Sequence, residues 1–386
     1  MSVVSTLFKI RQDKKICKNI LRKACYLKLF VLFCNGNGPV NRLSYIRMYH
    51  NMNKTCYYRL LSAWLTAWLG IGVINASSNY LFKHFDMQTG LSQYSVMAIT
   101  QDDTGFMWFG TKDGLNRFDG QNFKVYRSGE GSHGLECDYI NCLYKDPLNQ
   151  LWVGTDRGVY IYSSLTDTFR LFDSEAESGE KIVNNINLVC GHGEDVYINS
   201  QLQGVFRYNV TKRTLEHFPL TRLPNVTSLA VGDNGRIWIG IFGGGLLYTD
   251  DSFQNVNSYL GREGRNHFEG HTIFGIVPAE QGRLFVCDNL SGLHEVNTKE
   301  HTITNVMPEA GRRVYAHGLM RSGNELWMAT EDGLYVFEML TRNMHHYTYE
   351  PSNPFSISDN SLQCIFRDRD GGIWIGTYFG GVNYAP

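Results

Sequence analysis

The sequence predicts an all-β fold, namely a seven-bladed β-propeller of four-stranded antiparallel blades. Three observations support this. The 39 glycines, with 13% aromatic and only 19% charged residues, suit many short strands joined by tight turns. An aromatic residue on an apolar strand recurs seven times after residue 79, at intervals of 41 to 47 residues. A glycine follows each aromatic by six or seven residues. One repeat of this length is typical of a propeller blade.

The aromatic strands of the seven units have a common form, as in "MWFGTKDGLNRFD", "LWVGTDRGVYIYS" and "IWIGTYFGGVNYAP". Their anchor residues are Trp108, Trp152, Tyr197, Trp238, Phe285, Trp327 and Trp374. We expect these large, flat side chains to fill the gap between neighbouring wedge-shaped blades.

Each unit contains four predicted strands in a fixed order. An alternating apolar strand such as "VMAITQD", from Val96, comes first, and a turn rich in Asp, Gly and Asn, such as "DDTG", follows it. The aromatic strand is next, then a turn whose glycine needs a positive φ, then a third strand such as "LNRFD". A more polar outer strand such as "FKVYR" completes the blade.

The ring must also close, because an open junction would expose strand edges and an apolar face. The segment "LFKHFD", Leu81–Asp86, precedes the first complete unit and matches only an outer strand. The last unit, which ends at Pro386, lacks that strand. We therefore predict that Leu81–Asp86 completes the last blade.

The first part of the chain differs from the rest. Residues 1–51 carry ten Lys or Arg and a single acid, and residues 52–76 have the basic start, the apolar run and the small residues of a signal peptide cleaved after Ala76. The alternative is a membrane anchor, for which fifteen apolar residues are short. We expect Met52 to be the true start, 1–51 to be a basic leader outside the real protein, and 77–386 to form the propeller.

The nine cysteines include no C-x-x-C pair, which disfavours a zinc knuckle or a dithiol redox site. The five in the repeats are irregularly spaced, so we interpret them as small buried apolar side chains. They are Cys137, Cys142, Cys190, Cys287 and Cys364.

The sequence predicts no catalytic, cofactor or metal residues. "DTGFMW", from Asp103, resembles the Asp box of sialidases, but Gln101 stands where that motif has Ser or Thr. An Asp-Gly turn before an aromatic strand is ordinary hairpin chemistry. The repeats are nearly neutral and carry no basic stripe, which disfavours nucleic acid as a partner.

A ligand would meet the loops at one end of the disc, where the turns between second and third strands emerge with the connections between blades. Aromatic, charged and amide side chains gather in these loops, and this mixture suits a sugar. The candidate ligand residues are Tyr94, Lys112, Asp113, Tyr139, Asp156, Arg157, Phe242, Asp288, Asn289, Tyr315, Glu331, Tyr378 and Phe379. For most of them a role as solvated turn residues is the alternative.

These repeats resemble the two-component regulator propeller repeat, whose form is D-x-x-G, then Trp-x-Gly-Thr, then Gly-Leu. Asp102–Leu115 follows it almost position for position, whereas the units of Tyr197 and Phe285 lack both Trp and Gly-Thr. The resemblance implies the periplasmic sensor region of a hybrid two-component system from a glycan-degrading Gram-negative bacterium. Its implied partners are an oligosaccharide ligand and, in a longer parent, a second propeller, a β-sandwich domain and a histidine kinase; a homodimer stays open.

Three functions remain. The first is a non-enzymatic, exported sensor propeller, either a fragment of a longer regulator or a stand-alone relic, without kinase modules of its own. The second is a propeller glycosidase or polysaccharide lyase. The third is a protein-interaction platform without a small ligand.

Overall fold

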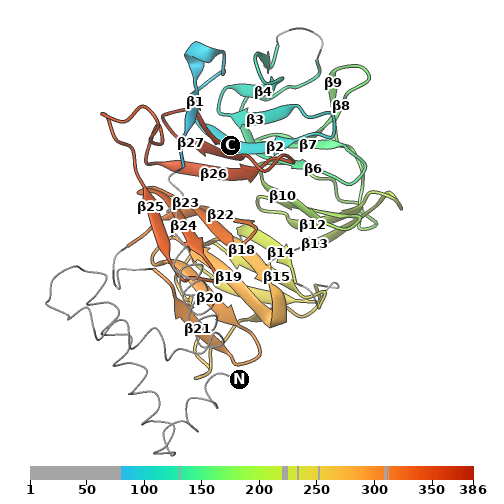
Figure 1. Ribbon diagram of the computed structural model, residues 1–386. Coiled ribbons are helices and arrows are strands. Elements are labelled where there is room, and N and C mark those ends of the chain that lie inside the picture. Colours follow the sequence, from blue (N-terminus) through green and yellow to red (C-terminus); the bar gives the residue numbers. More distant parts are fainter. Residues whose placement is uncertain are drawn as a thin grey trace, which may run out of the picture. The chain divides into compact units, whose positions relative to one another are not determined.

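The computed structural model divides the chain into two compact units, Met1–Asn79 and Tyr80–Pro386. The structure describes residues 80–386 except 130, 132, 220–224, 233, 251–252, 308–310 and 312. The predicted leader, 1–51, and signal peptide, 52–76, lie outside the described residues. Figure 1 shows the described residues of the second unit coloured from blue to red along the chain.

The second unit is a ring of seven four-stranded antiparallel sheets, as the sequence predicts. We number the sheets blades 1 to 7 and their strands A to D from the axis outwards. Blade 1 contains β2 (Val96–Gln101), β3 (Met107–Thr111), β4 (Gly114–Phe118) and β5 (Phe123–Tyr126); blade 2 contains β6 (Ile140–Lys145), β7 (Leu151–Thr155), β8 (Gly158–Ser163) and β9 (Thr168–Leu171); blade 3 contains β10 (Ile186–His192), β11 (Asp195–Ser200), β12 (Gly204–Asn209) and β13 (Thr214–Pro219).

The other four blades follow the same order. Blade 4 contains β14 (Val226–Val231), β15 (Ile237–Ile241), β16 (Gly245–Thr249) and β17 (Asn257–Ser258); blade 5 contains β18 (Ile273–Ala279), β19 (Arg283–Asp288), β20 (Gly292–Asn297) and β21 (Thr302–Asn305); blade 6 contains β22 (Ala316–Ser322), β23 (Glu325–Thr330), β24 (Gly333–Glu338) and β25 (Met344–Tyr347); blade 7 contains β26 (Leu362–Arg367), β27 (Ile373–Thr377), β28 (Val382–Ala385) and β1 (Lys83–Phe85). Two 3₁₀ turns, η1 (Met87–Thr89) and η2 (Glu280–Gly282), complete the described elements.

The ring closes through the strand predicted from Leu81–Asp86. In β1, Lys83 pairs with Tyr384 and Phe85 with Val382, both in the antiparallel β28. The A strands contact one another in an unbroken cycle, with β26 of blade 7 against β2 of blade 1 (Figure 1). The first and last strands of the propeller therefore share one sheet, and the predicted closure is confirmed.

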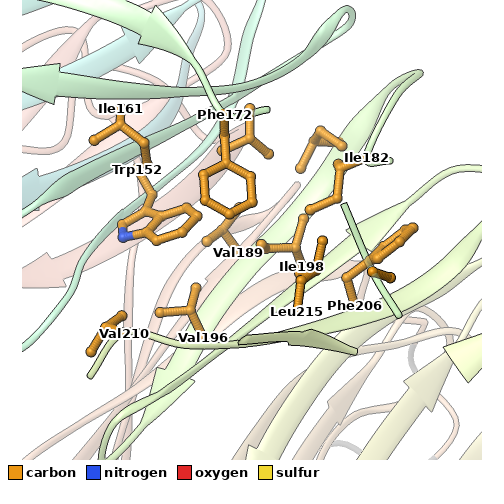
Figure 2. Close-up of a cluster of buried hydrophobic side chains, with 13 residues drawn as sticks. Trp152, Ile161, Phe172, Ile182, Val189, Val196, Ile198, Phe206, Val210 and Leu215 are labelled. Atoms are coloured by element: carbon orange, nitrogen blue, oxygen red, sulfur yellow. The ribbon is translucent and has the colours of Figure 1, made fainter. Parts of the chain in front are cut away.

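The core consists of layers between adjacent blades. All seven anchor aromatics are buried, which confirms their predicted place. Figure 2 shows the layer between blades 2 and 3, where Trp152 and Phe172 of blade 2 face Val189 and Ile198 of blade 3. Each aromatic therefore joins two sheets rather than filling one.

An aspartate six residues before the tryptophan builds the A–B turn in three blades. In blade 2, one carboxylate oxygen of Asp146 accepts the backbone N–H groups of Leu148 and Gln150, and the other accepts Trp152 Nε1–H at 2.9 Å. Asp102 and Asp368 bind Trp108 and Trp374 in the same way, each at 2.8 Å. The Asp of the D-x-x-G pattern is thus Asp102, one residue before the Asp103 of the Asp-box comparison.

The Gly-Thr of the repeat has two separate roles, which blade 2 illustrates. A Cβ on Gly154 would lie 2.4 Å from Cys142 Sγ and 2.9 Å from Ile186 of blade 3, so only glycine allows the blades to approach this closely. The hydroxyl of Thr155 donates to the Gly158 carbonyl at 2.9 Å and closes the B–C turn. The turn glycines of all seven blades have a positive φ, as predicted.

Asp167, in the C–D turn of blade 2, links the outer part of blade 1 to that of blade 2. It accepts hydrogen bonds from Tyr126 and Tyr162, each at 2.7 Å, and pairs with Arg117 and Lys124 of blade 1. Burial by itself raises the pKa of Asp167, but the bonds from Lys124 and the two tyrosines outweigh burial and hold this pKa well below its usual range. Three of the four donors belong to blade 1, so the ionised carboxylate joins blades 1 and 2.

We expect Asp167→Asn to lower the free energy of unfolding by about 2 kcal/mol at pH 7, since bonds to a charged acceptor are lost. The native-state pKa is depressed, so this contribution is present above the unfolded-state pKa of about 3.9 and is lost as the pH falls below it. Denaturant unfolding at pH 7 and pH 3 measures this difference. A gap between wild type and variant that stays equal at both pH values would contradict it.

Candidate functional site: the blade-connection face

The B–C turns and the connections between blades lie at one end of the propeller, which we call the connection face. Exposed aromatic side chains are confined to these loops in the described part of the chain. They are Tyr94, Phe242, Tyr315, Tyr349, Phe355 and Phe379. Phe355 lies apart from the others, because its carbonyl accepts the N–H of Phe82 just before β1. The A–B and C–D turns at the other end carry none of them.

Five of the predicted ligand residues come together over blades 7, 1 and 2. Lys112 Nζ donates to the Tyr378 hydroxyl and lies 5.8 Å from the ring centroid of Tyr139. Tyr378 meets Phe379 edge to face at 4.7 Å, and the Tyr94 carbonyl accepts an N–H from the same B–C turn. Phe379 is 68% exposed. This aromatic cluster offers ring faces beside one cation.

The charge of Lys112 is maintained within this cluster. Partial burial opposes the charge, but the hydrogen bond to Tyr378 and the nearby Tyr139 outweigh it and raise the pKa of Lys112. The ammonium group therefore remains a hydrogen-bond donor at neutral pH, held in place by two tyrosines.

Tyr315 and Glu331 form a second group, on blade 6. The Glu331 N–H donates to the Tyr315 carbonyl at 3.0 Å, and the Glu331 carboxylate lies 3.4 Å from His317 Nε2. Burial lowers the pKa of His317 more than Glu331 raises it. His317 is therefore mostly neutral at pH 7 and does not offset the carboxylate of Glu331.

The predicted residues of blades 1 and 2 outside the cluster are engaged within the protein. Asp156 accepts hydrogen bonds from Asn141 at 2.9 Å and Asn185 at 2.8 Å, and Asp113 pairs with Arg127 at 3.0 Å. The backbone N–H of Arg157 donates to Thr155 in the same turn. These residues shape the loops around the aromatic cluster.

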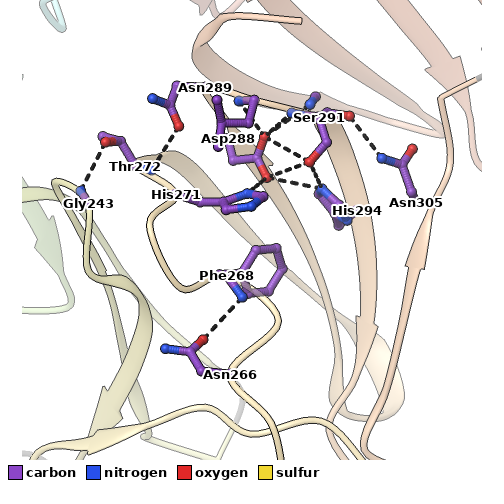
Figure 3. A network of polar contacts seen from close by, with 12 residues as sticks. Gly243, Asn266, Phe268, His271, Thr272, Asp288, Asn289, Ser291, His294 and Asn305 are labelled. Carbon is purple, nitrogen blue, oxygen red and sulfur yellow. Dashed lines mark hydrogen bonds and ion pairs between the residues drawn. The ribbon is translucent and has the colours of Figure 1, made fainter. Parts of the chain in front are cut away.

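Asp288 and Asn289 hold the connection between blades 4 and 5. Figure 3 shows His271 and His294 directed at the Asp288 carboxylate, at 2.7 and 3.1 Å, while Asn289 accepts the Thr272 N–H. Burial raises the pKa of the fully buried Asp288, but the bonds from His294 and the Ser291 N–H outweigh it and lower this pKa. Asp288 is thus part of the interior rather than of the exposed surface.

Ser291, His294 and Asp288 are the three residue types of a hydrolase triad. Here, however, Ser291 Oγ and Asp288 Oδ2 both contact the same nitrogen of His294, Nε2, at 3.0 and 3.1 Å. A relay requires the acid and the nucleophile on opposite ring nitrogens. This cluster is therefore not arranged to activate Ser291. Among the described residues, no group of three His, Cys, Asp or Glu could hold a metal ion.

Phe242 stands alone on blade 4, with its side chain 65% exposed. Its backbone N–H donates to the Asn225 carbonyl at 3.0 Å, which fixes the B–C turn. The structure does not bring it to the aromatic cluster.

A ring of bulged residues around the axis escaped sequence reasoning. In every blade the pairing of strands A and B shifts at the second residue of strand A, at its connection-face end. The bulged residues are Met97, Asn141, Asn187, Thr227, Phe274, His317 and Gln363. All are half-buried or exposed. The sequence does carry a signal for these bulges. The apolar alternation of strand A is interrupted at its second residue, because a bulge redirects that side chain.

In blades 1, 3 and 5 the residue before the bulge has a carbonyl that a side chain of the preceding blade contacts. Thr227 Oγ1 donates to the Ile273 carbonyl at 2.6 Å, and the thiols of Cys142 and Cys364 contact the carbonyls of Ile186 and Val96. Burial raises the pKa of both cysteines to about 12. These two cysteines lie half-buried between blades, as Cys190 does, whereas Cys137 and Cys287 are buried as predicted.

Three of the seven repeats match a known family of propeller repeats. The family model for the two component regulator propeller matches residues 90–113, 134–157 and 356–379, in blades 1, 2 and 7. These are the three repeats with both the Asp partner and Trp-x-Gly-Thr. The chain therefore carries two-component regulator propeller repeats, as the resemblance indicated.

Part of the chain is similar to a histidine kinase, and the propeller is similar to the extracellular domain of a hybrid two component system protein. A 69-residue stretch is 48% identical to histidine kinase P4 of Formosa agariphila, covering 18% of this chain and 5% of that protein. The extracellular domain of the hybrid two component system protein BT3049 from B. thetaiotaomicron aligns with a TM-score of 0.68 and 25% identity, over 79% of this chain and 42% of that one.

A second extracellular domain, of BT4673 from B. thetaiotaomicron, aligns with a TM-score of 0.67 and 21% identity, over 80% of this chain and 40% of that one. It shares the fold. The chain thus spans less than half the length of these relatives. No helix in the part of the chain that the structure describes is long and apolar enough to cross a membrane.

Proposed function

We propose that this propeller is a non-catalytic, periplasmic ligand-binding module of a hybrid two-component regulator and that it recognises oligosaccharides on its connection face. The observation that carries the proposal is the cluster of Tyr94, Lys112, Tyr139, Tyr378 and Phe379. Sugar rings pack their apolar faces on aromatic side chains, while their hydroxyl groups need donors and acceptors. Lys112 and the tyrosine hydroxyls supply these beside exposed rings.

The ring of bulged residues supports the same location. Asn141, Asn187, Thr227 and Gln363 place amide and hydroxyl groups around the axis at this end of the molecule. The cluster and the ring together offer a wide surface with little net charge. Such a surface suits an extended, hydroxyl-rich ligand better than a small ion.

In a longer parent protein, we propose that ligand binding is passed to a histidine kinase, by way of a second propeller and a β-sandwich domain. The similarity to extracellular domains of two-component systems supports this and also supports export by the predicted signal peptide. The glycosidase or lyase alternative predicts instead that a bound sugar is cleaved. The interaction-platform alternative predicts that no sugar binds.

Incubation with a panel of oligosaccharides distinguishes the three functions. We expect at least one oligosaccharide to raise the melting temperature without any product, because a ligand that binds only the folded state stabilises it. Formation of shorter products would indicate a glycosidase or lyase. Neither a shift nor a product, across the panel, would favour the interaction platform and contradict the sensor proposal.

For an oligosaccharide that binds, we expect Phe379→Ala to weaken the affinity about fivefold, since one aromatic contact contributes roughly 1 kcal/mol. Isothermal titration calorimetry gives the dissociation constants. Phe355→Ala is the matched control, because Phe355 is also an exposed phenylalanine, 54%, but lies near β1. An equal loss in both variants would show that the aromatic cluster is not the site.

A further inference from the structure

A groove at the outer rim of the propeller lies between blades 4 and 5, on the side of the C–D turns. It has a volume of about 550 Å³, within the range typical of small-ligand sites. Strands β16 and β17 with the following connection form one wall, and the C–D turn of blade 5 forms the other. Its central side chains are Arg236, Tyr248, Arg262, Glu300 and His301. Four of them lie in or beside the A–B and C–D turns, and Arg262 lies in the connection that follows β17; none belongs to the aromatic cluster.

Arg236 is held in a fixed position within this groove. Its guanidinium carbon lies 4.7 Å from the ring centroid of Tyr248 and 5.9 Å from that of Trp238. A guanidinium that stacks on aromatic faces keeps its N–H groups directed outward in one plane. Because its side chain is already ordered, a ligand that binds it loses less conformational entropy.

Neither arginine of the groove pairs with a carboxylate of the described residues. Within the described residues, no carboxylate lies at ion-pair distance from Arg236 or Arg262, and Glu263 next in sequence is 3.7 Å from Arg265 instead. Blade 4 also has Gly232 where blades 1, 2 and 7 have the aspartate that binds the tryptophan. This A–B turn therefore lacks the carboxylate found at that position in the other three blades.

The charge of the groove is positive. Its lining contains two arginines and one carboxylate, that of Glu300, so the formal charge is +1 with His301 neutral. His301 stacks on Tyr259 with ring centroids 6.1 Å apart, which fixes the second wall. Protonation of His301 would only increase the attraction for an anion.

The remaining lining groups are small and polar. Ser258 and Thr298 contribute hydroxyl groups, and Gly261 and Gly264 expose backbone in a turn closed by the bond from the Gly261 N–H to the Arg265 carbonyl. Hydroxyl and backbone groups pair with sugar hydroxyls, whereas a planar guanidinium forms bidentate hydrogen bonds with a carboxylate or sulfate. The arginines and these hydroxyl and backbone groups line the same groove.

We propose that this rim groove is a second binding site, for an acidic oligosaccharide whose carboxylate or sulfate pairs with Arg236 and Arg262. The site is separate from the aromatic cluster, so the propeller binds anionic and neutral parts of a glycan at different places. Binding depends on charge and weakens with added salt.

The test uses calorimetric titration of the full chain with four probes: trigalacturonic acid, a sulfated galacto-oligosaccharide, its unsulfated counterpart and sodium sulfate. We expect one or both acidic oligosaccharides to bind, which also distinguishes carboxylate from sulfate, and the unsulfated sugar to bind at least tenfold more weakly. Equal binding of the sulfated and unsulfated sugars, or binding of none of the acidic probes, would overturn the proposal. Binding of sodium sulfate as tight as that of the oligosaccharide would reduce the site to a simple anion site.

Four variants locate the binding. Arg236→Gln and the exposed Arg262→Gln should each weaken acidic-sugar binding about tenfold or more, whereas Arg170→Gln, on the outer strand of blade 2, should leave it unchanged. Phe379→Ala should also leave it unchanged, so failure here and failure of the proposed connection-face site can be told apart. Equal affinities for Arg236→Gln, Arg262→Gln and Arg170→Gln would overturn the assignment to this groove.

Discussion

Removal of Leu81–Asp86 is expected to destabilise the propeller more than any other change of similar size. The deletion takes away β1, opens the sheet of blade 7 at β28 and removes Phe82 and Phe85, which are 2% and 7% exposed. Phe85 also stacks on Trp374 with ring centroids 5.7 Å apart. Loss of two buried phenylalanines costs roughly 3 to 5 kcal/mol each. We expect the melting temperature to fall by about 10 °C or more.

Two point variants separate packing from strand loss. Phe85→Ala should lower the free energy of unfolding by about 3 kcal/mol, because it leaves a cavity between blades 7 and 1. Leu81→Ala is the control, since Leu81 is 60% exposed and lies outside β1. Differential scanning calorimetry compares them, and an unchanged transition for the deletion would refute closure by this strand.

The second large effect is expected at the aspartates that bind the tryptophan indole. Asp146→Ala leaves two turn N–H groups and the buried Trp152 Nε1–H without their acceptor. Unsatisfied buried donors cost about 1 to 3 kcal/mol each, so we expect a loss of about 3 kcal/mol or more. Chemical denaturation followed by tryptophan fluorescence measures both the stability and the indole environment.

Blade 7 offers a matched pair for this prediction. Asp368 accepts the Trp374 Nε1–H and the Gly372 N–H, whereas Asp370 in the same turn is exposed. Asp368→Ala should therefore behave like Asp146→Ala, and Asp370→Ala should stay within about 0.5 kcal/mol of wild type. A similar loss from both would mean that turn charge, rather than the indole bond, stabilises the blade.

The fold could be predicted because each blade repeats the same local requirements. Three of these requirements can be read directly from the sequence: the periodic aromatics, the turn glycine with positive φ and the apolar alternation of strand A. The position of β1 was also predictable, since only one segment lacked a partner and only one unit lacked a strand. The hydrogen bond between Asp102 and Trp108 was not predicted. Asp102 and Asp103 are adjacent, and a turn pattern does not show which of the two carboxylates faces the indole.

The connection face was predicted with less detail. Topology alone assigns loops to an end of the disc, so Lys112, Tyr378 and Phe379 could be placed there from sequence. Asp288 was assigned to the same loops, but its side chain is buried against His271 and His294, which lie 17 residues before it and six residues after it. This burial depends on how the long connection between blades 4 and 5 folds. The repeat pattern of the sequence does not show that.

The sequence by itself determined the number of blades, their strand order, the closing strand and the repeat family, because these follow from local propensity repeated seven times. Only the tertiary structure decided which side chains meet across blades. The aromatic cluster, the ring of bulged residues and the rim groove of Arg236 each combine residues from different blades. Their proximity depends on the angle and spacing of packed sheets, which side-chain volumes set jointly.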